Sequence, residues 1–361
     1  MMLESSTFFM LNVTKNAVHL LILILVFLSV LFFYKNGNLE SLELYAYDLL
    51  LQRHPAETTK SPVTVITVTE DDFRQLKRWT ISDELLAEVL TQLVEYKARV
   101  IGIDIYRDFP VPPGHKKLEN VFTQNQNIIV PMKFGDEKLR GFDPPPVLHN
   151  TEQVGLSDVF PDRDKIVRRG LLFLDDGKTI HYSFALRIAL LFLQQQGITP
   201  QPDAINPSHI QLGSTTIKPF QPNNGGYVNA DAGGYQFLLD FCQPSETIPR
   251  YDLHQFRSGN VRIKDFKDKI VLIGTVAESH NDNILKLCGR GGEINQRVSG
   301  VLLHTAIVNQ LLRIAQGGRT LLGTATDWQE VIWIMIWVLL GGLITQRQLT
   351  LFPLLLVWVG G

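Results

Sequence analysis

Apolar residues in the first half of the chain follow two spacings in turn. Short, β-branched runs begin at Val63 and at Val100, as expected of buried strands. Between them, leucine and valine recur every three or four residues from Leu85 to Val94, behind a potential capping residue, Ser82. A strand, a helix and a second strand over this length predict two parallel strands joined by a right-handed crossover.

The same two spacings continue to Ile314. Further strands are expected over Asn127 to Met132, Ile166 to Leu174, Tyr235 to Phe241 and Lys269 to Gly274. Further helices are expected over Leu39 to Gln52, His115 to Thr123, Ser183 to Leu193 and Ser299 to Ile314, the last capped by Ser299. The stretch from Gly197 to Gly234 is dense in Pro, Gly and Asn and predicts only short strands. The fold class is therefore α/β, with a mostly parallel sheet, flanking helices and a β-rich insertion.

Two uncharged or nearly uncharged stretches flank this domain, and each is about as long as a bilayer core is thick. A cleaved signal peptide is the alternative for the first, but no small residues mark a cleavage site after it. A third apolar stretch stops early, so we expect the chain to be a fragment of a longer protein. The expected order is a cytoplasmic N-terminus (1–16), a membrane helix (17–34), an extracytoplasmic domain (35–327), a second membrane helix (328–345) and the start of a further one (349–361).

Composition narrows the choice of partners. The formal net charge is −2, which gives no basic patch for nucleic acid or for an anionic membrane surface. The only two cysteines are Cys242 and Cys288. Outside the cytoplasm they have the option of forming a disulfide, and two separate free thiols are the alternative.

Polar residues follow three of the predicted strands. The carboxyl ends of parallel strands form the edge of a sheet where ligands bind. Clustered carboxylates there suit a hard cation, or the hydroxyls and amines of a small solute, and ordinary helix caps and solvated loop charges are the alternative. Asp104 stands out because it lies in an otherwise apolar strand and needs partners there. The predicted ligand-binding residues are Glu70, Asp71, Asp104, Arg107, Asp108, Thr275, Glu278 and Asp282.

Other candidate chemistry is sparse. His304 lies among apolar positions of the last predicted helix, which favours a core histidine with satisfied hydrogen bonds. The sequence contains no GxSxG, HExxH, P-loop or dinucleotide-binding glycine pattern. No catalytic residue, metal ligand or cofactor is therefore predicted.

From Leu39 to Ile314 the chain resembles the second CHASE family, a bacterial extracytoplasmic sensor domain. The resemblance rests on the order and spacing of VTVITVTEDDF, ARVIGIDIYRD, KDKIVLIGTVAESHND and GVLLHTAIVNQLL. The family typically has one membrane helix before the domain and three after it, and the expected spans here, one before the domain and a second plus a truncated third after it, are similar to that plan. The loop from Ile284 to Gly292 departs from the aromatic and proline residues common there.

The resemblance implies a periplasmic or extracellular domain of a multi-pass inner-membrane receptor. Such a receptor senses a small-molecule or ionic signal and drives a cytoplasmic histidine kinase, Ser/Thr kinase or nucleotide cyclase, here encoded beyond residue 361. Expected partners are that ligand, membrane lipid and a second copy of the chain, with no nucleic acid. The segment itself is not expected to be an enzyme. The alternatives are an extracytoplasmic metal-assisted hydrolase and a structural membrane-assembly protein.

Overall fold

A computed structural model describes residues 2–53, 61–135, 141–240, 248–280, 285–287, 296–317 and 322–359. They form two compact units. One comprises Met1–Tyr47, Gln221–Asp231 and Gly323–Gly361, and the other comprises Asp48–Phe220 and Ala232–Leu322. Three residues named above, Cys242, Asp282 and Cys288, lie outside the described residues.

A six-stranded sheet, parallel throughout, is the centre of the larger unit. Its strands lie in the order β11 (Arg250–Asp252), β1 (Val63–Val68), β12 (Ile270–Thr275), β2 (Val100–Asp104), β3 (Ile128–Met132) and β4 (Val154–Leu156). The three strands expected to end at one edge are therefore direct neighbours. Val68 pairs with Thr275, and Gly274 pairs with Asp104, so their carboxyl ends are level.

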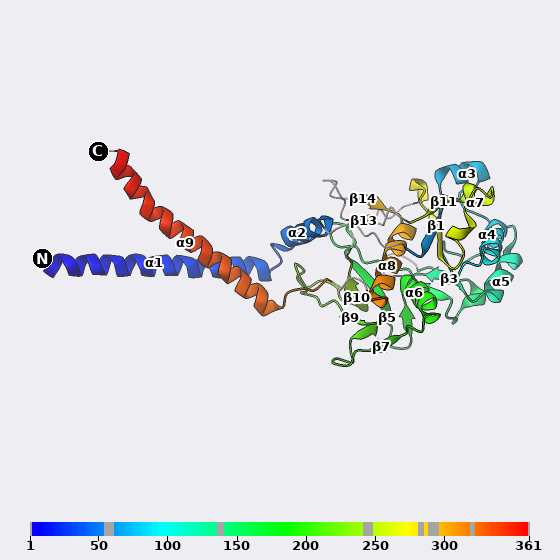
Figure 1. The fold of residues 1–361 in the computed structure, drawn as a ribbon, viewed down its shortest axis with the longest axis horizontal. Helices are drawn as coiled ribbons and strands as arrows, with labels where there is room; N and C mark the ends of the chain where they lie inside the picture. Colours follow the sequence, from blue (N-terminus) through cyan, green and yellow to red (C-terminus); the bar gives the residue numbers. More distant parts are fainter. Residues whose placement is uncertain are drawn as a thin grey trace. The chain divides into compact units, whose positions relative to one another are not determined.

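Helices cover both faces of this sheet, because successive strand residues point to opposite sides. Val63 and Val65 join one hydrophobic cluster, while Ile66 and Val68 join the other. Figure 1 shows α4 and α5 on one side of the sheet and α6 and α8 on the other. The helices of this unit are α3 (Glu70–Leu76), α4 (Asp83–Glu95), α5 (His115–Gln124), α6 (Phe184–Gln194), α7 (Leu253–Arg257) and α8 (Gly300–Ala315).

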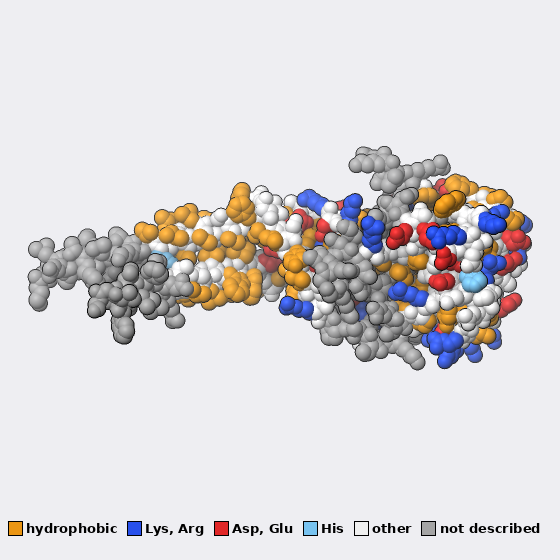
Figure 2. Space-filling view, turned by 90° about the horizontal axis from the view of Figure 1, so that it is seen from above, with side chains coloured by type: hydrophobic (Ala, Val, Ile, Leu, Met, Phe, Trp, Pro, Cys, Tyr) orange, Lys and Arg blue, Asp and Glu red, His pale blue; other side chains and the backbone are white. Residues whose placement is uncertain are grey.

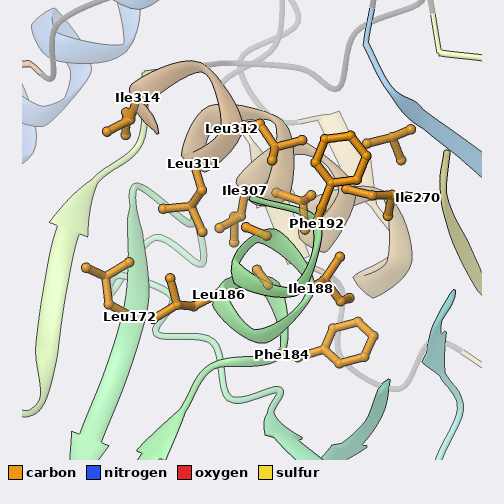
Figure 3. Close-up of a cluster of buried hydrophobic side chains, with 14 of the residues drawn as sticks. Leu172, Phe184, Leu186, Ile188, Phe192, Ile270, Ile307, Leu311, Leu312 and Ile314 are labelled. Atoms are coloured by element: carbon orange, nitrogen blue, oxygen red, sulfur yellow. The ribbon is translucent and has the colours of Figure 1, made fainter. Parts of the chain in front are cut away.

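The helix α8 packs into one of the two hydrophobic clusters of the core. It packs on α6, and Figure 3 shows the side chains that meet between them, including Leu186, Ile188 and Phe192 of α6 and Ile307, Leu311 and Leu312 of α8. Each fully buried side chain of this size contributes about 1.5–3 kcal/mol. The packing of α8 on α6 therefore contributes much of the stability of this part of the core.

Two small antiparallel sheets form the β-rich part of the larger unit. One has the order β10 (Tyr235–Leu238), β5 (Arg169–Asp175), β6 (Ile180–Tyr182), and the other is β7 (Pro200–Pro202), β8 (Ile210–Leu212), β9 (Thr215–Ile217). The expected strand from Ile166 thus forms a hairpin in its own sheet. A further described pair is β13 (Leu285–Leu287) with β14 (Gln296–Val298).

A buried ion-pair network holds the second half of α2 (Glu40–Gln52). Arg168 donates to both carboxylate oxygens of Asp48 at 2.8 and 2.7 Å, and also to Asp162 and Asp164. The side chains of Arg168 and Asp48 are only 2% and 3% exposed. Bidentate geometry and burial make this a strong, directional contact.

The smaller unit contains two helices with the length and composition of membrane spans. They are Asn16–Lys35 of α1 (Met2–Lys35) and Asp327–Gln346 of α9 (Asp327–Val359). Figure 2 shows hydrophobic side chains covering the described surface of these helices. Tyr34 donates a hydrogen bond to Glu330, which joins the two helices. The stretch expected to begin a further span lies, as far as Val359, within the same α9.

Candidate functional site

Asp104 ends β2 at the carboxyl edge of the sheet, against the start of α8. A Cβ added at Gly300 would lie 2.9 Å from Asp104 Oδ2, and one added at Gly274 would lie 3.2 Å from Asp104 Cβ. Glycine at both positions allows this close approach. The first turn of α8 is the positive end of its helix dipole and favours a carboxylate there.

The carboxylate of Asp104 receives no hydrogen bond from any residue that the structure describes. Burial raises the pKa of its carboxyl, and the neighbouring His304 opposes that change. A carboxylate in such surroundings favours either a proton or a cationic or hydrogen-bond-donating partner.

His304 lies one turn further along α8 and is 5% exposed. Its ring meets the ring of Phe184 edge to face, with 5.2 Å between centroids. Its Nδ1 has no hydrogen-bond partner among the described residues. Burial lowers the pKa of the imidazole, while the charges of Asp104 and Asp158 act in the opposite direction. His304 is thus a core histidine, as expected, but its hydrogen bonds are not satisfied.

Asp158 brings a second carboxylate to His304 from the loop after β4. It accepts a hydrogen bond from the backbone N–H of Phe134 at 3.0 Å. Burial raises the pKa of its carboxyl despite that bond. The pKa values of two carboxyls and one imidazole are thus each shifted toward the neutral form, and the charges of both carboxylates act on the imidazole.

Tyr106 and Ser157 add hydroxyls to this cluster. The Ser157 hydroxyl donates to the carbonyl of Met132 at 3.0 Å and lies 2.8 Å from the Tyr106 hydroxyl, which is left to donate. The Tyr106 ring stacks on Phe142, with 4.3 Å between centroids. Burial raises the pKa of Tyr106 to about 12, and the charges of Asp104 and Asp158 act in the same direction. The phenol therefore remains protonated at physiological pH.

Ser299 takes the N-cap position of α8, as expected, but its hydroxyl makes no capping hydrogen bond. The side chain is buried, with 6% of the residue exposed, and Oγ has no partner among the described residues. Buried polar atoms are usually paired. Ser299 Oγ and His304 Nδ1 are thus two unpaired polar atoms on the first turns of one helix.

The other predicted residues occupy different surroundings. Glu70 and Asp71 lie in the first turn of α3, where Glu70 accepts from the backbone of Ser279 at 2.8 Å. That bond joins the loops after β1 and β12. Asp71 forms an exposed ion pair with Arg74.

Arg107 does not contribute a free donor to the edge. Its guanidinium is buried, lies 3.2 Å from Asp83 of α4 and donates to the carbonyls of Ile81 and Tyr106. It fixes the loop after β2, which also carries the half-buried Asp108.

Thr275 serves the backbone at the end of β12. Its hydroxyl donates to the carbonyl of Val68 and accepts from the N–H of Ala277, both at 3.3 Å. Glu278 is exposed in a short 3₁₀ helix, Glu278–His280.

Of the seven predicted residues that the structure describes, it thus places only Asp104 beside these polar groups. We call the group Asp104, Tyr106, Ser157, Asp158, Ser299 and His304 the polar cluster. Among the described residues, no group of three His, Cys, Asp or Glu side chains is arranged to hold a metal ion.

A family model, the CHASE2 domain, matches residues 21–343. The chain belongs to the CHASE2 family. CHASE2 domains are extracellular sensor domains rather than catalytic ones, which gives this protein a sensing role outside the cell. The two apolar helices that flank the domain support a membrane protein. Neither a curated protein nor a solved structure matched the chain.

Proposed function

We propose that this CHASE2 domain binds a small polar solute or cation at the polar cluster and relays the binding event along α8 to the membrane. The observation that carries the proposal is the set of three buried or half-buried polar groups at the start of α8. Ser299 Oγ and His304 Nδ1 are buried and lack hydrogen-bond partners among the described residues, and the half-buried Asp104 beside them has a carboxylate without a hydrogen bond to a described residue.

The chemistry of these groups defines the class of ligand. Leaving a buried donor or acceptor unpaired costs about 1–3 kcal/mol. A carboxylate needs a donor or a cation, whereas a hydroxyl serves as donor or acceptor. We expect an amine, a hydroxyl-bearing solute or a hydrated cation to pair with Asp104, Ser299 Oγ and His304 Nδ1. Binding of such a ligand would remove the free-energy penalty of leaving these polar groups unpaired.

The relay follows from how α8 is built and where it leads. The ligand would contact its first turns, and its C-terminal end at Ala315 is followed, twelve positions later, by the start of α9 at Asp327. A ligand shifts such an equilibrium only by its differential affinity for the two arrangements. Tight packing of α8 on α6 makes a rigid shift of the pair the favoured response.

The remaining topology is part of the same proposal. Residues 35–327 would lie outside the cytoplasm, between spans of a multi-pass inner-membrane receptor that works as a homodimer. The output module would be a cytoplasmic kinase or cyclase beyond residue 361. Its support is the family match and the two apolar helices.

A thermal-shift panel on the full chain in lipid nanodiscs tests the ligand site. The panel contains magnesium, calcium, primary amines and amino acids, and the variants are Asp104→Asn and the matched control Asp71→Asn. We expect at least one solute to stabilise wild type and Asp71→Asn at concentrations about tenfold lower than it needs for Asp104→Asn. If every stabilising solute acts equally on Asp104→Asn, the site lies elsewhere.

A further inference from the structure

A cavity lies between the two small antiparallel sheets, away from the polar cluster. Its volume is about 160 Å³. Leu172 and Tyr182 line it from the β5–β6 hairpin, Leu212 and Ile217 line it from β8 and β9, and Leu186 of α6 completes the wall. Its lining consists of aliphatic and aromatic side chains, with no charged residue.

A tyrosine links the two small sheets beside this cavity. The hydroxyl of Tyr235, on β10, accepts from the backbone N–H of Ile210 at 2.9 Å and donates to the carbonyl of Ile217 at 2.5 Å. Tyr235 also pairs with Phe173 of β5 through the β10–β5 ladder. One side chain thus joins the β10–β5 pair to both β8 and β9.

An apolar cavity of this size has a definite preference for what fills it. Water needs two to four polar partners to occupy a cavity, and an apolar cavity of about 150 Å³ stays dry and takes up benzene or xenon. The lining residue Ile180 is 52% exposed, so it marks an entrance from solvent. We propose that this cavity is a binding site for a compact, uncharged apolar molecule about the size of one aromatic ring.

The cavity reaches α8 by two routes. The turn between β8 and β9 contains Gly213, at φ +62°, where an added Cβ would lie 1.9 Å from the carbonyl oxygen of Ala315 at the end of α8. The opposite wall includes Leu186, two residues beyond the Phe184 that meets His304. An apolar occupant therefore acts on the same helix as the polar cluster, but from its other end.

The test uses the full chain in lipid nanodiscs and toluene as the probe. We expect toluene near its solubility limit to raise the unfolding midpoint of wild type by about 2–4 °C. Ile210→Phe fills the cavity from the β8 side and should abolish this shift. Ile263→Phe makes the same change at an exposed site away from the cavity and should retain it. Partition of toluene into lipid is common to all samples and cancels in the comparison.

A second filling variant keeps the test decisive if Ile210→Phe does not fold. Leu186→Phe fills the cavity from α6 and should likewise lose the toluene shift. The proposal is overturned if wild type shows no shift beyond that of the filled variants, or if a folded filled variant keeps the full shift. The outcome is independent of whether the polar cluster binds a ligand.

Discussion

Replacing Arg168 by methionine would test how firmly the larger unit holds the second half of α2, the helix that follows the apolar α1 in sequence. Methionine keeps most of the length of the side chain and removes the guanidinium. Asp48 and Asp162, whose side chains are 3% and 6% exposed, would then be buried without their contacts to Arg168. Because the charge of a buried carboxylate is costly without its cation, the loss should far exceed that of a surface pair.

The expected magnitude follows from that burial. Breaking a buried ion pair from one side costs about 3–5 kcal/mol. For a domain of this size each kcal/mol lowers the unfolding midpoint by about 2–4 °C, so the fall should be about 6–20 °C. The control is Arg262→Met. Arg262 also pairs with a carboxylate, Asp265, at 2.8 Å, but its side chain is 65% exposed, and solvent-exposed pairs contribute little to stability.

Thermal unfolding of the full chain in nanodiscs, followed by near-UV circular dichroism, measures both variants. A double variant, Arg168→Met with Asp48→Leu, should recover part of the loss because one buried charge is gone. Equal falls for Arg168→Met and Arg262→Met would refute the reasoning, since burial would then contribute nothing to the strength of the pair.

Two further predictions concern α8. Burial lowers the pKa of His304, so the unfolded chain binds a proton there before the folded domain does, and stability is lost as pH falls below about 6.5. His304→Phe should therefore lose less stability than wild type between about pH 7.5 and 5.5 in urea denaturation. The raised pKa values of Asp104 and Asp158 act in the opposite direction in both proteins, and equal losses would contradict the assignment. Gly213→Ala should lower the unfolding midpoint more than Gly177→Ala. Both glycines have positive φ, but only Gly213 faces a backbone oxygen within 4 Å, that of Ala315 in α8. Equal midpoints for the two variants would show that the β8–β9 turn does not contact α8 closely.

Hydrophobic spacing was enough to predict four of the six strands of the main sheet and most of the helices, but not the three-residue strands β4 and β11. The strands at Val63, Val100 and Ile270 are buried on both faces and read as short apolar runs, and α4 begins after Ser82 as expected. A local sequence pattern does not reveal which strands are neighbours in a sheet. The prediction of a common edge assumed that β1, β12 and β2 are neighbours, and the strand order confirms this assumption.

The polar cluster was only partly predictable. Asp104 was found because a carboxylate in an apolar strand is conspicuous. Asp158, which acts on His304, and Tyr106, which contacts Ser157, were missed because they come from segments that only the β2–β3–β4 order brings together. Charge and position in sequence also did not reveal the partner of Arg107. It lies between Asp104 and Asp108 in sequence, yet its guanidinium pairs with Asp83 of α4.

Hydrogen–deuterium exchange of the full chain in nanodiscs tests the central claim, that a change in the charge of the polar cluster alters the stability of α8 along its length. Asp104→Asn mimics the carboxylate neutralised by a ligand or a proton, and Asp71→Asn is the exposed control. The account predicts changed exchange rates in Asp104→Asn for α8 amides from Val301 to Leu312 and for the first turn of α9, with no change in the control. Unchanged exchange along α8 in Asp104→Asn, or the same change in both variants, would contradict it.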